Sequence, residues 1–353
     1  MLALDKKLEE KKMERRRIRL FSICMIVVML FAQAASLFAE GSKEAPAVKP
    51  IVMRLAHISN EEHPSHIAAL KFKEIVEQES KGSLLVEVYS NSSLGSAPEY
   101  TEQLKMGTLE LGLVTSGQLQ VWVPENGAVM IPFLFESYDH AHRALDGEAG
   151  DLLAEFSRKK GFVVISNWEW GFRQLSNNKL PVEKPEDLAK LKMRVPNEIQ
   201  LMEMYKALGS MTAIISFPEL YMALAQGVVD GQCNPLATIY FQKLYEVQPY
   251  VSILNHVYNT QMLVASEKIW NSLSAEQQAI VSKASAEAGD LCRELTVASE
   301  KDIINKLVAA GVKVNYPKLD PFRAKMAPAV KAIADFAGVE FTNKFVALVE
   351  AAR

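Results

Sequence analysis

The sequence has few cysteines and none of the short motifs by which common enzyme classes hold a nucleophile, a nucleotide or a catalytic metal. Three cysteines stand among 353 residues, too few for a disulfide framework. The patterns G-x-S-x-G, G-x-x-x-x-G-K-[ST], G-x-G-x-x-G and H-E-x-x-H are all absent. Their absence points away from elbow-type serine hydrolases, P-loop and dinucleotide enzymes and zinc peptidases. No cofactor is expected.

An excess of basic residues is also missing. The chain holds 39 Lys and Arg against 42 Asp and Glu. Residues 1–39 account for eight of the basic and four of the acidic residues, which leaves 39 − 8 = 31 and 42 − 4 = 38, a net charge of −7. Nucleic acids and anionic lipids reward basic surfaces, so neither is expected as a partner. An anionic ligand would need a local basic site.

Residues 1–39 have the pattern of an export signal. Arginines at positions 15, 16, 17 and 19 precede an apolar run from Leu20 to Leu30. Ala32-Gln33-Ala34 offers a small-x-small cleavage site, with Ala39 as an alternative. A retained anchor is the competing interpretation, because Leu20 to Phe38 is nearly long enough to span a membrane.

Translation is predicted to start at Met13, since acidic residues before it are unusual in a signal. Lipidation of Cys24 is not expected, because the neighbouring small residues of a lipoprotein signal are missing. Beyond the signal, Cys233 and Cys292 could form one disulfide, but two buried free thiols are the preferred interpretation. Residues 40–50 are polar and contain proline, which is typical of a flexible linker.

The remaining chain, about 310 residues long, exceeds the size at which a single core tends to split, so two domains are expected. Strand and helix patterns alternate, which predicts parallel strands joined by crossover helices and an α/β fold. The first unit has strands at Ile51–Ala56, Leu84–Tyr89 and Leu109–Thr115, with helices from Pro64 to near Gly82 and over Glu99–Met106.

The α/β pattern then restarts. The second unit has strands at Phe162–Ser166 and Leu191–Val195, a helix over Glu198–Leu208, a capping box at Ser216–Glu219 opening a helix that Gly227 ends, and a short strand over Val228–Gly231. A second capping box at Ser274 opens a helical pattern that continues to Ala310. At 1.5 Å per residue, about 37 residues would span about 55 Å. Such a helix either kinks near Gly289 or bridges both domains, and bridging is favoured.

The most informative chemistry lies between Gly171 and Pro235. Arg194 follows a short apolar strand and precedes the turn at Pro196. A guanidinium there can present paired N–H donors to a carboxylate. No nucleophile or phosphate loop accompanies it, so the residues indicate capture of an acid.

His63 and His66 are candidates for a metal site, but no other ligands cluster near them and no metal is expected. A solvated helix start is the plain alternative. His63 is better interpreted as the cap of the helix that begins at Pro64, where free N–H groups favour an anion.

At these residues the chain resembles the solute-binding proteins of tripartite ATP-independent periplasmic (TRAP) transporters over roughly residues 51–325. The matching segments, in order, are Leu94-Gly95, Ile131-Pro132-Phe133-Leu134-Phe135, Gly171-Phe172-Arg173, Leu191-Lys192-Met193-Arg194-Val195-Pro196-Asn197, and Val229-Asp230-Gly231-Gln232 followed by Asn234-Pro235.

The resemblance implies a two-lobed receptor of the Venus-flytrap type, with a cleft between α/β lobes and a long interdomain helix. Lobe I would comprise residues 51–170 and 260–299, and lobe II residues 171–259 and 300–353. Arg194 would bind the ligand carboxylate through two hydrogen bonds, supported by Arg173 and Asn234. Phe217 matches the aromatic position that closes over the ligand, and Trp170 would lie near the cleft. The alternatives are a surface or interdomain salt bridge for the two arginines, core packing for Trp170 and Phe217, and a structural turn role, set by Pro235, for Asn234.

Several residues depart from the family pattern. Cys233 stands where a glutamate is common. Thr115 and Gln118 occupy positions that are charged in sialic-acid receptors, which disfavours sialic acid. Trp170 replaces a frequent asparagine, and His63-Pro64 and Trp168-Glu169 resemble members that take uronates and other sugar acids.

The implied partners are a small organic acid and the TRAP permease subunits, and the implied location is the periplasm. A monomer is expected. C4-dicarboxylates, keto acids, sugar acids and aromatic acids all fit the anchor. An exported lyase or hydrolase is the rival function, with Glu169, Glu219 or His63 as a general base. A receptor that serves a sensor kinase is a third possibility.

Overall fold

The computed structural model describes residues 8–23, 25, 29 and 49–353. The chain divides into two compact units, Met1–Lys49 and Pro50–Arg353. In the first, residues 8–23 are helical. No helix within the described ranges combines the length and the apolar character needed to cross a membrane. The predicted cleavage sites, Cys24 and the linker up to residue 48 lie outside the described residues.

The unit Pro50–Arg353 contains two β-sheets. The first has the order β2-β1-β3-β11-β4, in which β1, β2 and β3 are parallel and β11 runs antiparallel to both neighbours. Its strands are β1 (Ile51–Ala56), β2 (Leu84–Tyr89), β3 (Leu111–Thr115), β4 (Phe162–Asn167) and β11 (Gln261–Ser266). The elements that accompany it are α2 (Pro64–Glu79), α3 (Ala97–Met106), α4 (Ser116–Leu119), η1 (Pro124–Met130), α5 (Tyr138–Leu145), α6 (Glu148–Lys159) and α11 (Glu267–Trp270).

The second sheet has the order β12-β9-β5-β8-β6-β7, and β10 pairs with β5. Its strands are β5 (Gly171–Asn177), β6 (Lys192–Val195), β7 (Met211–Ile214), β8 (Gly231–Pro235), β9 (Tyr250–Ser252), β10 (Tyr258–Asn259) and β12 (Lys313–Asn315). The other elements are α7 (Pro185–Leu188), α8 (Ile199–Ala207), α9 (Leu220–Ala225), α10 (Leu236–Phe241), η2 (Leu244–Glu246), α13 (Asp320–Arg323), α14 (Ala327–Ala337) and α15 (Val339–Ala351). The α/β prediction and the two-lobed architecture are confirmed.

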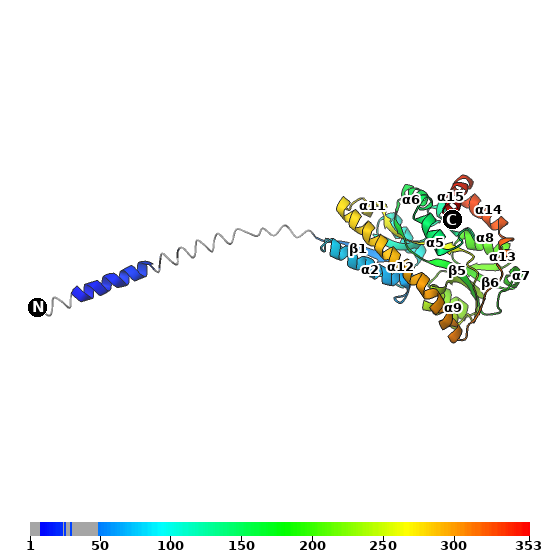
Figure 1. The fold of residues 1–353 in the computed structure, drawn as a ribbon, viewed down its shortest axis with the longest axis horizontal. Coiled ribbons are helices and arrows are strands. Elements are labelled where there is room, and N and C mark those ends of the chain that lie inside the picture. The colour runs from blue at the N-terminus through cyan, green and yellow to red at the C-terminus, as the bar shows by residue number, and fades with distance from the viewer. Residues whose placement is uncertain (1–7, 24, 26–28, 30–48) are drawn as a thin grey trace. The chain divides into compact units, whose positions relative to one another are not determined.

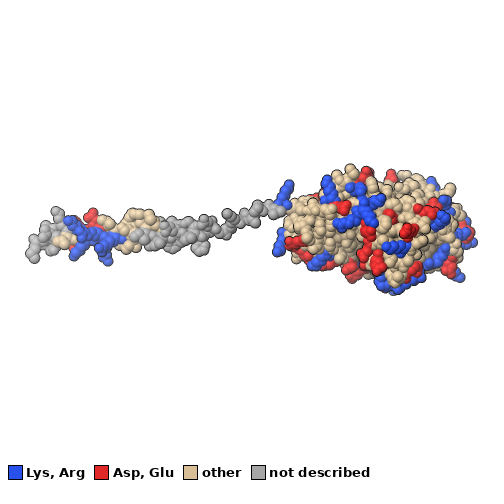
Figure 2. All heavy atoms as spheres, turned by 90° about the horizontal axis from the view of Figure 1, so that it is seen from above, with Lys and Arg blue, Asp and Glu red and all other residues tan. Residues whose placement is uncertain are grey.

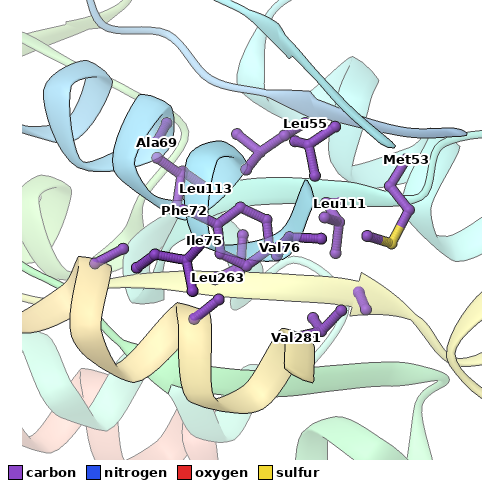
Figure 3. Packing of buried hydrophobic residues seen from close by; sticks show 14 of the residues in the cluster. Met53, Leu55, Ala69, Phe72, Ile75, Val76, Leu111, Leu113, Leu263 and Val281 are labelled. Carbon is purple, nitrogen blue, oxygen red and sulfur yellow. The ribbon is translucent and has the colours of Figure 1, made fainter. Parts of the chain in front are cut away.

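Each sheet buries its own core. In lobe I, which is built on the first sheet, Phe72 and Val76 of α2 lie against the strands, and Val281 of α12 (Ala275–Ala309) joins the same cluster (Figure 3). In lobe II, built on the second sheet, Leu175, Met193 and other side chains pack with α8. The C-terminal helix α15, which was predicted to belong to lobe II, packs against α5 and α6, which were predicted to belong to lobe I. The residue boundaries of the lobes stay a prediction.

The long helix predicted after Ser274 is confirmed as α12 (Ala275–Ala309), which Ser274 caps as predicted. It packs against α2 and β4 of the first lobe and against α10 and β12 of the second, so it bridges both (Figure 1). It runs through Gly289 without a break. A Cβ at Gly289 would lie 2.9 Å from Cδ1 of Trp168, so the glycine permits close packing.

Two local predictions were wrong. Residues 228–230 form bends, and strand β8 begins at Gly231, where the turn had been expected. A side chain at Gly231 would place its Cβ 2.4 Å from the Ser176 carbonyl oxygen, so only glycine lets the strand start there. The second wrong prediction is the capping box at Ser216–Glu219. The Ser216 hydroxyl does bond Glu219, at 2.5 Å, but helix α9 starts only at Leu220, with Glu219 and not Ser216 as its cap residue.

Candidate functional site

A cavity of about 240 Å³ lies between the two lobes. Thr115, Arg194 and Ile214 belong to the carboxyl ends of β3, β6 and β7, the edge at which α/β sheets commonly bind ligands. Seven of the predicted site residues line it. The full lining is Ile58, Ala97, Pro98, Thr115, Gln118, Val121, Trp170, Arg173, Arg194, Pro196, Asn197, Glu198, Ile214, Ile215, Ser216, Phe217 and Asn234.

Arg194 is fixed by the strand that carries it. Strand β6 lies between β7 and β8, and Nε of Arg194 donates to the Ile215 carbonyl oxygen at 2.8 Å. No described protein group accepts a hydrogen bond from its terminal nitrogens. Burial and the nearby Arg173 charge lower the pKa of Arg194 to about 10, so the side chain still carries its charge at neutral pH. Its two terminal nitrogens have the geometry to bind a carboxylate.

Arg173 is oriented by Cys233. Strands β5 and β8 are antiparallel, with Leu175 opposite Cys233. Nε of Arg173 donates to Cys233 Sγ at 3.3 Å, and Nη2 donates to the Cys233 carbonyl oxygen. Sγ and the carbonyl oxygen of Cys233 therefore hold the guanidinium in place. Cys233 and Cys292 are both buried free thiols, as predicted.

Asn234 is held by a chain of buried amides and hydroxyls. Its Nδ2 donates to Gln232 Oε1 at 2.6 Å, and Gln232 Nε2 donates to Ser176 Oγ at 2.8 Å. Ser176 in turn donates to Gln248 Oε1 at 3.2 Å. These bonds fix the rotamer of Asn234 at the cavity, so it is preorganised.

Aromatic rings form one wall of the cavity. Trp170 stacks on His63, with ring centroids 5.2 Å apart, and meets Phe217 edge-on at 6.4 Å. Trp170 belongs to the segment between the two sheets, whereas Phe217 follows β7. The core packing proposed as an alternative for these residues therefore occurs together with cavity lining.

Thr115 and Gln118 lie on the lobe I side. Gln118 Oε1 accepts a hydrogen bond from the Thr115 backbone nitrogen at 3.1 Å. Oγ1 of Thr115 is buried and has no hydrogen-bond partner in the described part of the chain. Its hydrogen-bonding capacity is therefore unused within that part of the chain.

His63 and Glu169 do not line the cavity. His63 caps α2 as predicted, since its Nδ1 accepts from the Ser65 backbone nitrogen at 3.1 Å. It lies behind Trp170, and burial lowers its pKa to about 3. It is therefore neutral, and the helix start it caps is covered by aromatic rings.

Glu169 belongs to a separate buried cluster. Its Oε2 lies 2.7 Å from His142 Nε2 and accepts from the Tyr258 hydroxyl at 3.1 Å. Burial raises the pKa of Glu169, which the His142 contact partly offsets. The side chain of Glu169 points away from the cavity. Its place in the sequence between Trp168 and Trp170 does not indicate this orientation. Glu219 is exposed, so none of the three proposed general bases lines the cavity.

Glu198 is the charged cavity residue that sequence reasoning missed. It was interpreted only as the start of a helix, which it is, since it precedes α8 as its cap residue. Burial raises the pKa of its carboxyl, while Arg173 and Arg194 act in the opposite direction. An acidic residue four positions after Arg194 was the available signal. Among the described residues no group of three or more His, Cys, Asp or Glu could hold a metal ion.

The two lobes are in contact around the cavity. Gln200 Nε2 of α8 donates to Gln120 Oε1 at 2.8 Å, and Asn60 Nδ2 donates to the Phe241 carbonyl oxygen at 2.5 Å. Both Gln120 and Asn60 belong to lobe I. These contacts join the two lobes directly.

Comparison with known proteins places this geometry among solute receptors. Residues 55–335 match the DctP family, described as bacterial extracellular solute-binding protein, family 7. The sialic acid-binding periplasmic protein SiaP of Vibrio cholerae is 32% identical over 282 residues, which cover 80% of this chain and 88% of SiaP. The 2,3-diketo-L-gulonate-binding periplasmic protein YiaO of Escherichia coli is 31% identical over 290 residues, 82% of this chain and 87% of YiaO.

A solved structure has the same fold. The sugar acid binding protein DctPAm of Advenella mimigardefordensis, in complex with galactonate, superposes with a TM-score of 0.84 at 30% identity. The match covers 87% of this chain and 100% of that one. The similarity therefore extends over both lobes and the cavity.

Proposed function

Because the chain belongs to family 7 of the bacterial extracellular solute-binding proteins, whose members are receptors and not enzymes, we propose that it binds an organic acid between its lobes. Arg194 anchors the ligand carboxylate, with Arg173 and Asn234 beside it and Trp170 and Phe217 covering the apolar side. Thr115 and Gln118 complete the lobe I wall.

One observation carries this proposal. Arg194 is 3% exposed, lines the cavity and uses only Nε in its described hydrogen bonds. A carboxylate that enters the cavity loses its water, and a paired, charge-assisted interaction with a guanidinium offsets that loss. The terminal nitrogens of Arg194 supply such an interaction.

The relatives support a sugar acid as the ligand. They are named for sialic acid and 2,3-diketo-L-gulonate, and the solved structure holds galactonate. Uronates and C4-dicarboxylates share the same carboxylate handle. Uncharged Thr115 and Gln118 on the lobe I wall favour the smaller sugar acids over sialic acid.

The receptor acts by closing on its ligand. A ligand that touches both lobes draws the equilibrium between open and closed forms toward the closed one. The closed form then delivers the acid to the membrane subunits of a TRAP permease. Residues 1–39 direct export to the periplasm, where the receptor acts as a monomer, and no covalent step is involved.

The direct test is to identify the ligand. Native mass spectrometry of the protein as purified, followed by thermal shifts with galactonate, glucuronate, 2,3-diketo-L-gulonate, sialic acid and succinate, is expected to find at least one bound acid. Ligand at one hundred times its dissociation constant should stabilise the fold by about 2.7 kcal/mol. A protein that none of these acids stabilises would contradict the proposal, as would one that chemically alters a bound acid.

A further inference from the structure

Glu198 is a buried carboxylate without a protein partner inside the proposed ligand cavity. The residue is 3% exposed and lines the cavity beside both arginines. Its Oε2 atom is fully buried with no hydrogen-bond partner among the described residues. The fold makes room for it, because a Cβ at Gly117 would lie 2.6 Å from Cδ of Glu198.

A carboxylate in such a position is costly unless something donates to it. Arg173 and Arg194 attract it through space, but in the described part of the chain neither forms an ion pair with it. Its oxygens therefore have unused hydrogen-bonding capacity beside the cavity. Thr115 Oγ1, also buried and without a partner, and the hydroxyl of Ser216 are further polar groups on the lining.

The charges of the lining limit what the cavity can hold. Its ionisable residues are Arg173, Arg194 and Glu198, which give 2 − 1 = +1 when Glu198 is ionised. A monocarboxylate balances this charge. A dicarboxylate would leave a net negative charge in the cavity and bring a second anionic group close to Glu198, which is unfavourable.

We propose that Glu198 determines specificity: it accepts hydrogen bonds from the hydroxyl groups of a hydroxylated monocarboxylic acid and rejects dicarboxylic acids. This rests on the proposed function, because it assumes that Arg194 holds the ligand carboxylate. Galactonate and glucuronate have the required chemistry, whereas succinate has a second carboxylate and butyrate has no hydroxyl.

Calorimetry at neutral pH with these four acids tests the proposal on wild-type protein, Glu198→Gln and Arg194→Lys. Wild type should bind galactonate or glucuronate at least about tenfold more tightly than succinate or butyrate. Glu198→Gln keeps the shape, removes the charge and places an N–H donor in the cavity. This substitution should lower the affinity for the hydroxy acid about tenfold and raise the affinity for succinate by a similar factor.

Two controls keep the result interpretable. Glu203→Gln makes the same change on α8, where Glu203 pairs with Lys206, and should alter neither affinity. Thermal melting of Glu198→Gln without ligand should match or exceed wild type, because an unpaired buried charge has been removed. A folded Glu198→Gln protein is thereby established.

The failures are distinguishable. If succinate binds wild type as tightly as the hydroxy acids do, the role proposed for Glu198 is wrong and the receptor function stands. The same conclusion follows if Arg194→Lys weakens all binding while Glu198→Gln leaves the ratio of hydroxy-acid affinity to succinate affinity unchanged. If no acid binds, the proposed function itself fails and the specificity proposal fails with it. If acids bind but Arg194→Lys changes no affinity, Arg194 is not the anchor, and the specificity proposal, which assumes that it is, fails while the receptor function stands.

Discussion

At the level of single residues, Arg194 differs from the neighbouring arginine in how it is held. Arg173 gives Nε and one terminal nitrogen to Cys233, while Arg194 gives only Nε to Ile215. The number of terminal donors left for a ligand is therefore greater at Arg194. This difference supports the proposal that Arg194 is the anchor and Arg173 its support.

Arg194→Lys should weaken binding of the native acid about tenfold or more, because lysine keeps the charge but loses the planar pair of donors, a cost of about 1.5–3 kcal/mol. Calorimetry on the identified ligand measures it. The matched control is Arg158→Lys on the surface of lobe I, where the arginine side chain is 54% exposed. Unchanged affinity for the Arg194 variant would exclude it as the anchor.

Cys233 acts as an acceptor for a buried guanidinium. Cys233→Ala should reduce the free energy of unfolding by about 1–3 kcal/mol, because Nε of Arg173 then loses its partner. Cys233→Ser retains an acceptor of smaller size and should lose less. Urea unfolding of the three proteins provides the comparison, and an alanine variant as stable as wild type would show that the Sγ contact contributes nothing.

At the level of elements, sequence periodicity located most of the helices and strands it addressed. β1 and β2 have the predicted bounds, and α12 matches within a few residues because its capping box and uninterrupted helical pattern are local signals. β8 was displaced because its start depends on contact with Ser176, on a different strand. Local sequence periodicity carries no information on contacts between strands that are distant in the sequence.

In the candidate site, too, residues marked by local signals were predicted, and residues that depend on contacts between distant segments were not. Seven of nine predicted residues line the cavity because they are near strand ends, which the sheets bring to one edge. Glu169 was misplaced because it lies between Trp168 and Trp170 and its side chain contacts His142 and Tyr258 instead of the cavity. His63 was misplaced because the ring of Trp170 stacks on it. Glu198 was missed because its importance arises only when α8 of one lobe meets Gly117 of the other.

Gly289→Ala on α12 separates packing from helix propensity. Propensity alone predicts a gain of up to about 1 kcal/mol. The added methyl would lie 2.9 Å from Trp168 Cδ1 and 3.2 Å from the Asn167 carbonyl oxygen, and overpacking of this kind costs about 1–3 kcal/mol.

The net result for Gly289→Ala should therefore be a loss of stability in chemical denaturation. Ala286→Gly at an exposed site of the same helix should also destabilise, by about 1 kcal/mol. Opposite signs for the two changes, with Gly289→Ala more stable than wild type, would refute close packing at this point.

At the level of the whole molecule, the surface mixes acidic and basic side chains on the face seen in Figure 2, whereas several histidines are buried and uncharged. Burial lowers the pKa values of His57, His63 and His256 to about 3 from 6.5. The unfolded chain therefore takes up protons that the folded protein does not.

Stability should accordingly fall as the pH drops below about 6.5 toward 3, by up to about 1.4 kcal/mol per pH unit for each such histidine. His63→Asn keeps a capping side chain at α2. It should reduce the slope of the unfolding free energy against pH by the contribution of one histidine. Urea unfolding over a pH series measures it. Parallel curves for wild type and variant would contradict the assignment of His63 as a buried neutral group.

The position of β11 has a consequence for how the protein is made. This strand lies between β3 and β4, yet it is the last of the first sheet to be synthesised, after every strand of the second sheet except β12. β4 therefore has no partner in its sheet until residues 261–266 are available, and pairing at such long sequence separation is slow. Lobe I, which contains the amino-terminal strand, should be completed only after most of lobe II exists. A nascent chain shorter than this cannot assemble the cleft, and the chain stays incompletely folded through most of its synthesis.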